Sequence, residues 1–203
     1  MFSLTKPTAA HINEFIRTQR PLPLTYTEVG ATRNLVLPLG YGTNRLRRQL
    51  GTGEAVYEHA KTAMREWQMY NLSWTELYPA NTPLTEDEIF VAVVRHLGFW
   101  SLNPCRIVYT IDEHSDDRQK FGFAIGTLPK HSESGEERFA VEFIRSSQTV
   151  WYEIFAFARA YDPLARLGTP FVRLLQKQFA RDSFRAMRRA VNDKAKGKRQ
   201  KDE

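Results

Sequence analysis

The sequence contains a single cysteine, Cys105, so no disulfide can form within its 203 residues. This excludes the disulfide-rich secreted class, and also the zinc and redox motifs that need several cysteines. No apolar run approaches the roughly 20 residues of a membrane-spanning helix, and residues 1–23 lack the basic start and apolar block of a secretory signal. These absences lead us to expect a cytoplasmic protein.

Motifs for cofactors and metals are missing as well. The glycine pairs at 40–42 and 51–53 lack both the lysine of a phosphate-binding loop and the third glycine of a dinucleotide-binding turn. The histidines at 11, 59, 96 and 114 have no metal-like spacing, and no Gly-x-Ser-x-Gly motif occurs. We therefore expect neither a cofactor nor a metal, and an ordinary serine hydrolase is disfavoured.

An excess of basic residues occurs only near the carboxyl terminus. Residues 173–203 contain 11 Lys or Arg and 4 Asp or Glu, whereas the preceding residues contain 18 and 19. The net charge of +6 therefore comes from the last segment. Because the rest of the protein carries no general basic field, this distribution argues against nucleic acid as a partner.

Composition and hydrophobic periodicity predict a single α+β domain over residues 35–193. The chain is 42% hydrophobic and 26% charged, which is typical of a globular domain. Residues 1–34 are expected to form an N-terminal arm that leans on this domain, with Thr8 capping a short helix. Residues 194–203 have the polar, basic composition of a flexible tail.

Two helices and seven strands are expected within the domain. Amphipathic spacing predicts one helix over 54–69, capped by Thr52 or Gly53, and a longer one from Pro163 to about Val191. Alternating or β-branched runs predict strands at 35–41, 72–78, 88–97, 104–112, 121–128, 136–145 and 149–158. Short connections favour antiparallel neighbours. We therefore expect a curved antiparallel sheet of about six or seven strands wrapped around the last helix, with the first helix closing one end.

The predicted strand at 149–158 is apolar on both faces. Trp151 and Phe157 alternate with Tyr152 and Ile154, so neither face is clearly the solvated one. A sheet with two apolar faces needs a cover on the second face, and the N-terminal arm is the simplest choice. A partner or a lipid-like surface stays open as an alternative.

One segment resembles a known family. Gly122–Phe139 reads Gly-Phe-Ala-Ile-Gly-Thr-Leu-Pro-Lys-His, then three residues, then Gly-Glu-Glu-Arg-Phe. This block resembles the hallmark of the family catalogued as domain of unknown function 1990, and the resemblance extends over about residues 40–188. Supporting matches are Cys105–Tyr109, Val150–Ile154, Leu50–Gly53 with Trp67, Leu175–Gln176 and Phe179–Met187.

The order of strands and helices in that family is similar to the helix-grip superfamily (SRPBCC), which includes START domains and proteins like the birch-pollen allergen. This likeness implies an internal apolar cavity and a lipid, hormone or polyketide as ligand. A fold does not determine function. The resemblance therefore implies a hydrophobic or amphipathic small molecule as partner, held between the sheet and the last helix.

The hairpin within the family block collects the first candidate site residues. His131, Glu136, Glu137 and Arg138 lie in or beside this hairpin and must be close in space. They can fix the loop by hydrogen bonds to its amides, contact a ligand, or perform acid/base chemistry. Strand alternation puts Glu136 and Arg138 on one face and Glu137 on the other, so at most one of the glutamates faces a cavity.

Glu153 lies among aromatic residues, where a carboxylate needs a partner or a proton. Arg106 or Arg138, on neighbouring strands, can form an ion pair with it. Alternatively, Glu153 is one of a few polar groups that orient a ligand in an apolar pocket. Together with the hairpin, we expect ligand contacts from Trp67, Tyr109, Thr127, His131, Glu136, Arg138, Glu153 and Phe171.

The last predicted helix carries basic residues at four-residue steps. Arg173, Lys177, Arg181 and Arg185 form a cationic ridge, for which the simplest interpretation is a solvated helix face. The ridge can also contact the anionic headgroups of a membrane surface. The sequence makes no prediction about the oligomeric state.

These observations favour non-catalytic binding of a hydrophobic or amphipathic small molecule. Two alternatives stay open. The first is a cavity enzyme of the cyclase, isomerase or hydrolase type, with His131, Glu136 or Glu153 as acid or base. The second is an interaction module with a filled core that acts through its basic helix.

Overall fold

The described residues form one curved antiparallel sheet of eight strands. The computed structural model describes residues 2–35, 38–96, 98–160 and 169–199. The order across the sheet is β2-β8-β7-β6-β5-β4-β3, and the short β1 pairs with β5. The strands are β1 Phe2–Ser3, β2 Gly42–Thr52, β3 Thr75–Tyr78, β4 Ile89–His96, β5 Phe99–His114, β6 Arg118–Thr127, β7 Glu133–Ile144 and β8 Thr149–Ala160.

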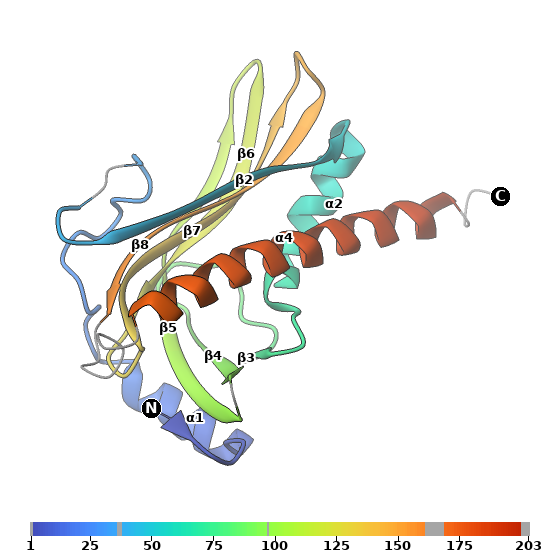
Figure 1. Ribbon diagram of the computed structural model, residues 1–203. Helices are drawn as coiled ribbons and strands as arrows, with labels where there is room; N and C mark the ends of the chain where they lie inside the picture. Colours follow the sequence, from blue (N-terminus) through green and yellow to red (C-terminus); the bar gives the residue numbers. More distant parts are fainter. Residues whose placement is uncertain (1, 36–37, 97, 161–168, 200–203) are drawn as a thin grey trace.

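The long helix α4, Thr169–Arg199, lies across one face of the sheet, within its curve (Figure 1). This confirms the expected curved sheet around a C-terminal helix. The expected start at Pro163 lies outside the described residues. The helix continues past the expected end at Val191, because the lysines, alanine and arginine that follow are good helix formers even without an apolar face. No helix in the described part of the chain is long and apolar enough to cross a membrane.

A second helix, α2, Glu54–Arg65, covers one end of the sheet beside α4 (Figure 1). Its N-cap is Gly53, whose φ of 89° lies in the left-handed region that favours glycine. The chain departs from the α-helix after Arg65, because Trp67 adopts a left-handed φ of 54° and leads into the short 3-10 helix η1, Gln68–Tyr70. The single helix expected over 54–69 is therefore two short ones.

Aromatic side chains fill the interior beneath α2. The Trp67 ring lies 4.7 Å from the Phe90 ring and 4.9 Å from the Phe123 ring, measured between centroids. Phe123 stacks on Phe139 at 5.5 Å. Met187, from the C-terminal half of α4, joins the same buried cluster. This end of the fold is consequently packed with side chains.

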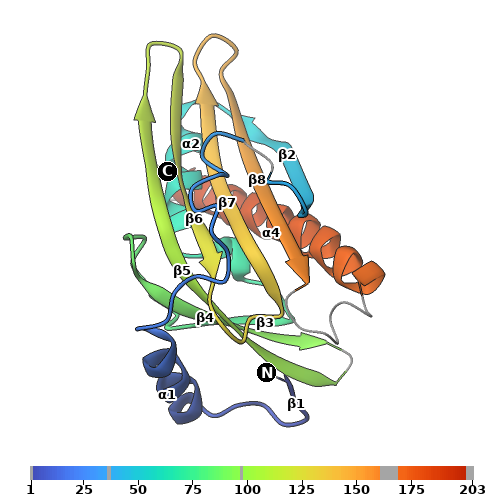
Figure 2. The ribbon, with the colours of Figure 1, turned by 90° about the vertical axis from the view of Figure 1, so that its left-hand side faces the viewer.

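N-terminal residues cover the opposite face of the sheet (Figure 2). Helix α1, Ala9–Gln19, is capped by the Thr8 side chain, as expected, and buries Ile12 and Ile16 in a cluster with residues of β4 and β5. Residues 25–33 then run across β6 and β7; we call them the N-terminal strap. The apolar second face of the sheet thus has its cover within the chain.

The expected first strand at 35–41 is wrong, and the strand at this edge is β2. None of the described residues in 35–41 is in a strand: Leu35 has a φ of 55°, and Leu39 is 96% exposed. In the sheet order β2 has a neighbour on one side only, β8, and it carries Arg45, Arg47 and Arg48. Charged residues are typical of edge strands, and they weaken the apolar alternation by which a strand is predicted.

Candidate functional site

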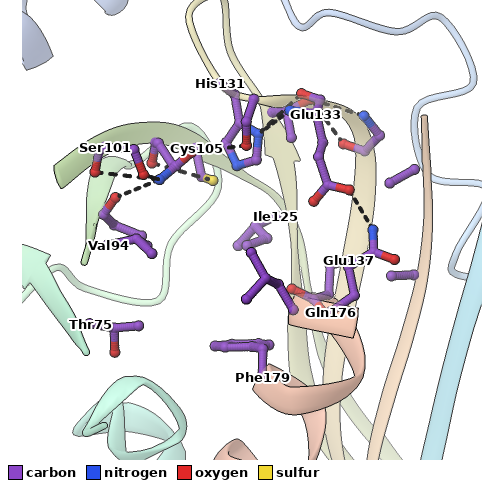
Figure 3. A pocket seen from close by; sticks show the side chains of 18 of the residues that line it. Thr75, Val94, Ser101, Cys105, Ile125, His131, Glu133, Glu137, Gln176 and Phe179 are labelled. Atoms are coloured by element: carbon purple, nitrogen blue, oxygen red, sulfur yellow. Dashed lines mark hydrogen bonds between the residues drawn. The ribbon is translucent and has the colours of Figure 1, made fainter. Parts of the chain in front are cut away.

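A pocket of about 370 Å³ lies between the sheet and the N-terminal half of α4. Ligand pockets typically have volumes of about 300–1,000 Å³. Figure 3 shows the pocket walls, which come from the inner face of the sheet on one side and from α4 on the other. The apolar part of the lining includes Val94, Ile125, Ala156, Leu175 and Phe179. The interior of the fold is therefore packed beneath α2 and hollow toward the start of α4.

Strand alternation in β7 directs two carboxyl groups into this pocket. Glu133 and Glu137 are four residues apart and line it together, while Glu136 and Arg138 direct their charged groups to the other face of the sheet. This arrangement confirms that only one of the adjacent glutamates, Glu137, points its carboxyl group inward. Figure 3 shows its side chain extending from β7 into the pocket.

Glu137 makes no hydrogen bond within the described part of the chain. Enclosure by the pocket walls disfavours the charged form, and the nearby Glu133 adds repulsion; together they raise the pKa of the Glu137 carboxyl to about 8. At neutral pH the group is therefore mostly protonated. The carboxyl group can donate and accept hydrogen bonds, but no described residue forms one with it.

Glu133 has a partner from α4. The Gln176 side-chain amide donates to its carboxyl group, which ties the start of α4 to β7. Burial raises the pKa of Glu133 to about 7, and the bond from Gln176 opposes that rise. The two carboxyl groups of the pocket therefore both titrate close to neutrality.

The histidines of the pocket are neutral. The His131 Nδ1 accepts a hydrogen bond from the Glu133 backbone N–H at 2.9 Å, and burial lowers the pKa of the ring to about 4. Burial also lowers the pKa of His96. Burial raises the pKa of the Cys105 thiol, so the sulfur is an unreactive thiol.

Other polar side chains of the pocket lining form hydrogen bonds within the protein. Asn103 donates from Nδ2 to Ser101 Oγ at 3.0 Å, and it accepts at Oδ1 from Ser132 Oγ at 3.2 Å. Thr127 Oγ1 accepts from the Gly135 N–H at 3.0 Å. These groups form hydrogen bonds within the protein, whereas the Glu137 carboxyl group can still form hydrogen bonds with a ligand.

Only some of the expected ligand contacts lie at the pocket. Thr127 and His131 line it, and Glu136 does so although its carboxylate points elsewhere. Trp67 belongs to the packed aromatic core, where its indole N–H donates to the Thr82 carbonyl at 2.7 Å. The side chain of Phe171 lies outside the described residues.

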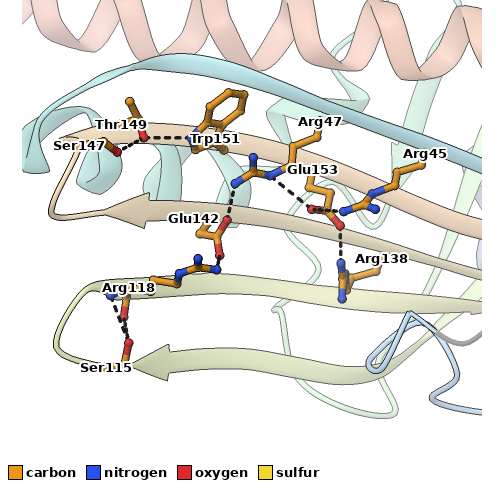
Figure 4. A network of polar contacts seen from close by, with 10 residues as sticks. All are labelled: Arg45, Arg47, Ser115, Arg118, Arg138, Glu142, Ser147, Thr149, Trp151 and Glu153. Atoms are coloured by element: carbon orange, nitrogen blue, oxygen red, sulfur yellow. Dashed lines mark hydrogen bonds and ion pairs between the residues drawn. The ribbon is translucent and has the colours of Figure 1, made fainter.

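Tyr109, Arg138 and Glu153 lie on the face of the sheet away from the pocket. Arg138 pairs with Glu153 in a buried contact, which confirms the expected ion pair with the second of its two alternative partners (Figure 4). Arg106 instead donates to the carbonyls of Arg20 and Leu22. These residues are absent from the pocket lining, so a ligand in it does not contact them.

Arg138 and Glu153 belong to a network that crosses four strands, because Arg118 of β6 lies 3.7 Å from Glu142. Arg45 and Arg47 of β2 lie 3.6 and 3.7 Å from Glu153, and Arg47 also pairs with Glu142 at 2.6 Å (Figure 4). A buried carboxylate is costly unless it is paired. The network supplies these partners and connects the edge strand to the centre of the sheet.

Glu136 fastens the N-terminal strap. Its carboxylate accepts from Tyr26 Oη at 2.7 Å, from the Gly30 N–H at 2.7 Å and from the Thr32 N–H at 3.0 Å. Thr32 in turn bonds Tyr109 Oη at 2.7 Å. The path of the strap is thus fixed by several bonds to one carboxylate, which is a structural role.

The cationic ridge of α4 lies on the outside of the molecule. Arg173, Lys177, Arg181 and Arg185 are all exposed, and the neighbouring Leu174 is 55% exposed. Arg185 pairs with Asp182 at 3.1 Å. The ridge begins beside Leu175 and Gln176, which line the pocket.

Sequence reasoning missed Glu133 and Gln176 as pocket residues, and of the two adjacent glutamates it named Glu136 rather than Glu137 as the ligand contact. A signal for Glu137 was present, because strand alternation puts it on the same face as Phe139 and Val141, which are buried in the core. Gln176 could not be found in this way, since its contact with β7 depends on where α4 crosses the sheet.

A curved antiparallel sheet that holds a long C-terminal helix, with a pocket between them, is a helix-grip fold. A solved structure with this likeness is TTHA0849 from Thermus thermophilus, with a TM-score of 0.50, 13% identity, and coverage of 75% of this chain and 98% of that one. Human STARD10 gives a TM-score of 0.49 at 9% identity, over 97% of this chain and 84% of that one.

The chain belongs to the family described as domain of unknown function (DUF1990), whose model matches residues 25–186. A UPF0548 protein of Dictyostelium discoideum is 31% identical over 94% of this chain and 96% of its own length. A UPF0548 protein of Deinococcus radiodurans is 36% identical over 94% of this chain and 99% of its own. The match begins at residue 25, where the N-terminal strap begins, rather than at about 40 as the sequence block suggested.

Proposed function

We propose that this protein binds an amphipathic small molecule in the pocket between the sheet and α4, without chemical conversion. The observation that carries the proposal is a hollow, mostly apolar interior with one enclosed carboxyl group, Glu137, that no described residue satisfies. An apolar chain fits between Ile125 and Phe179. The polar end of the ligand then meets Glu137, which would fix its orientation.

A cavity enzyme is the second candidate, and one observation favours it. The pKa of Glu137 is raised to about 8 and that of Glu133 to about 7, values suited to acid/base work near neutral pH. The acid or base would then be Glu137 rather than Glu136 or Glu153, whose carboxylates are held by partners on the outer face. Binding is preferred, because the pocket presents no activated nucleophile among its described residues.

The exposed position of the cationic ridge supports contact with an anionic membrane surface as an accessory function. The ridge starts beside the pocket, so a membrane bound there would lie near the ligand. We also retain a cytoplasmic location as part of the proposal, which suits the buried, unpaired thiol of Cys105.

A pocket-filling variant tests the binding proposal. Ala156 lines the pocket from β8, and the larger side chain in Ala156→Leu would occupy space that the alkyl chain needs. We expect it to weaken binding of 1-octanol by about tenfold, which corresponds to about 1.4 kcal/mol. Isothermal titration calorimetry measures the dissociation constant. Ala55→Leu, an exposed site on α2, is the matched control and should bind like the parent protein. Equal affinity of both variants would contradict the location of the site.

A further inference from the structure

The charges around the pocket are strongly one-sided. Its lining contains the carboxyl groups of Glu133 and Glu137 but, in the part of the chain that the structure describes, no lysine or arginine. The histidines are neutral, because burial lowers the pKa values of His96 and His131. Among the described residues, the pocket lining therefore offers no positive charge to pair with an ionised Glu133 or Glu137.

The other titratable groups near Glu137 do not supply such a balance. Tyr70 of η1, Cys105 of β5 and Tyr152 of β8 are all buried, and burial raises the pKa of each, so they stay protonated and neutral. Each can lose a proton but cannot carry a positive charge. Arg45, Arg47 and Arg138 lie on the outer face of the sheet, where all three contact Glu153.

Glu133 and Glu137 differ in whether the protein supplies a hydrogen-bond partner for the carboxyl group. Glu133 is held by Gln176, whereas Glu137 is enclosed, points into the pocket and has no hydrogen-bond partner among the described residues. An enclosed carboxyl group without a partner is costly to the protein whether it is charged or neutral. A cation that carries N–H donors would satisfy it and would gain a charge-assisted hydrogen bond.

We propose that the molecule bound in this pocket is an amphipathic amine, with its apolar part between the sheet and α4 and its ammonium group on Glu137, and Glu133 beside it. This inference rests on the proposed binding function and narrows it to a chemical class. A carboxylate or phosphate head is disfavoured, because it would meet two acidic groups and no cation among the described lining residues. A neutral alcohol can bind, but it forgoes the ion pair.

Proton linkage gives the proposal a pH signature. The free carboxyl of Glu137 has a pKa of about 8 and is mostly protonated at pH 7, whereas the ion pair needs it ionised. Binding of an amine therefore releases a proton. Because an alkylamine stays charged below about pH 10, its affinity should rise by up to about tenfold per pH unit toward pH 8 and then level off.

Three probes of equal chain length test this class directly: octylamine, 1-octanol and octanoate, compared by isothermal titration calorimetry at pH 9, where the Glu137 carboxyl is ionised and octylamine is still charged. We expect octylamine to bind at least about tenfold more tightly than 1-octanol, and octanoate more weakly than both, because a charge-assisted bond exceeds a neutral one by about that factor. In Glu137→Gln the advantage of octylamine should vanish while the affinity for 1-octanol is kept. The affinity of the variant for octylamine should also lose its rise with pH.

Glu113→Gln is the matched control, since it removes the same charge from an exposed position on β5 and should leave all three affinities unchanged. Retained binding of 1-octanol shows that Glu137→Gln is folded. If octanoate or 1-octanol binds the parent protein as tightly as octylamine, the amine assignment is overturned while the binding proposal stands. If none of the three binds, the proposed function itself fails, and this inference fails with it.

Discussion

At the scale of single residues, two adjacent glutamates have opposite environments. Glu136 accepts hydrogen bonds from Tyr26, Gly30 and Thr32 on the outer face, and Glu137 faces the pocket without a partner among the described residues. The sequence predicts their separation by strand alternation. It does not identify which of the two is satisfied, because the partners of Glu136 lie more than 100 positions away in the chain.

The unsatisfied carboxyl group predicts a pH effect on stability. A folded-state pKa of about 8 for Glu137 exceeds that of the unfolded chain, so the folded state binds more protons, and stability is fully present below about pH 4.5 and is lost as pH rises toward 8. Glu137→Gln removes this titration. We expect the variant to gain about 1–3 kcal/mol in unfolding free energy at pH 7 relative to the parent protein, and little at pH 4.5.

Urea denaturation at pH 4.5, 6, 7 and 8 measures this difference. Glu113→Gln, exposed on β5, controls for the loss of one acidic charge and should follow the parent protein at every pH. A constant difference between Glu137→Gln and the parent across this range would contradict the raised pKa of Glu137.

At the scale of elements, one edge strand, β2, escaped prediction, whereas the other edge strand, β3, and the strands between them were predicted. The strands β5 to β8 were expected within a few residues of their ends, since their buried side chains alternate or are apolar throughout. The edge strand β2 was not predicted, because its arginines interrupt the apolar alternation by which a strand is recognised. Its pairing with β8 is stabilised by the ion pairs of Arg45 and Arg47 with Glu153, which only the folded sheet brings together.

One side of helix α4 lines the pocket, and the opposite side carries the cationic ridge and is exposed to solvent. Lys177→Glu combined with Arg181→Glu should weaken binding to vesicles that contain anionic lipid by about tenfold or more, because each basic residue near such a surface contributes about 1 kcal/mol. Sedimentation with liposomes at low and raised salt measures this effect.

The matched control combines Arg17→Glu and Arg20→Glu, which reverse two exposed charges on and at the end of α1. It should keep the binding of the parent protein. Equal binding of the parent protein to neutral and anionic vesicles would show that the ridge is only a solvated face.

At the scale of the whole molecule, one end of the space between the sheet and the helices is packed with side chains, and the other end is a pocket. Aromatic residues such as Trp67 and Phe123 pack the end beneath α2, whereas the end beneath the start of α4 encloses the pocket. The sequence predicts a curved sheet around a helix and a gap between them. It does not predict which half of the gap is hollow, because that depends on how closely α4 approaches the sheet at each turn.

The most direct test of the account is a crystal structure of the protein equilibrated with 1-octanol. We expect electron density for the alkyl chain between Ile125 and Phe179, with the hydroxyl group within hydrogen-bond distance of Glu137. A structure in which Leu175 and Phe179 close onto the sheet and leave no room for the probe would contradict the central claim that this fold encloses a binding pocket.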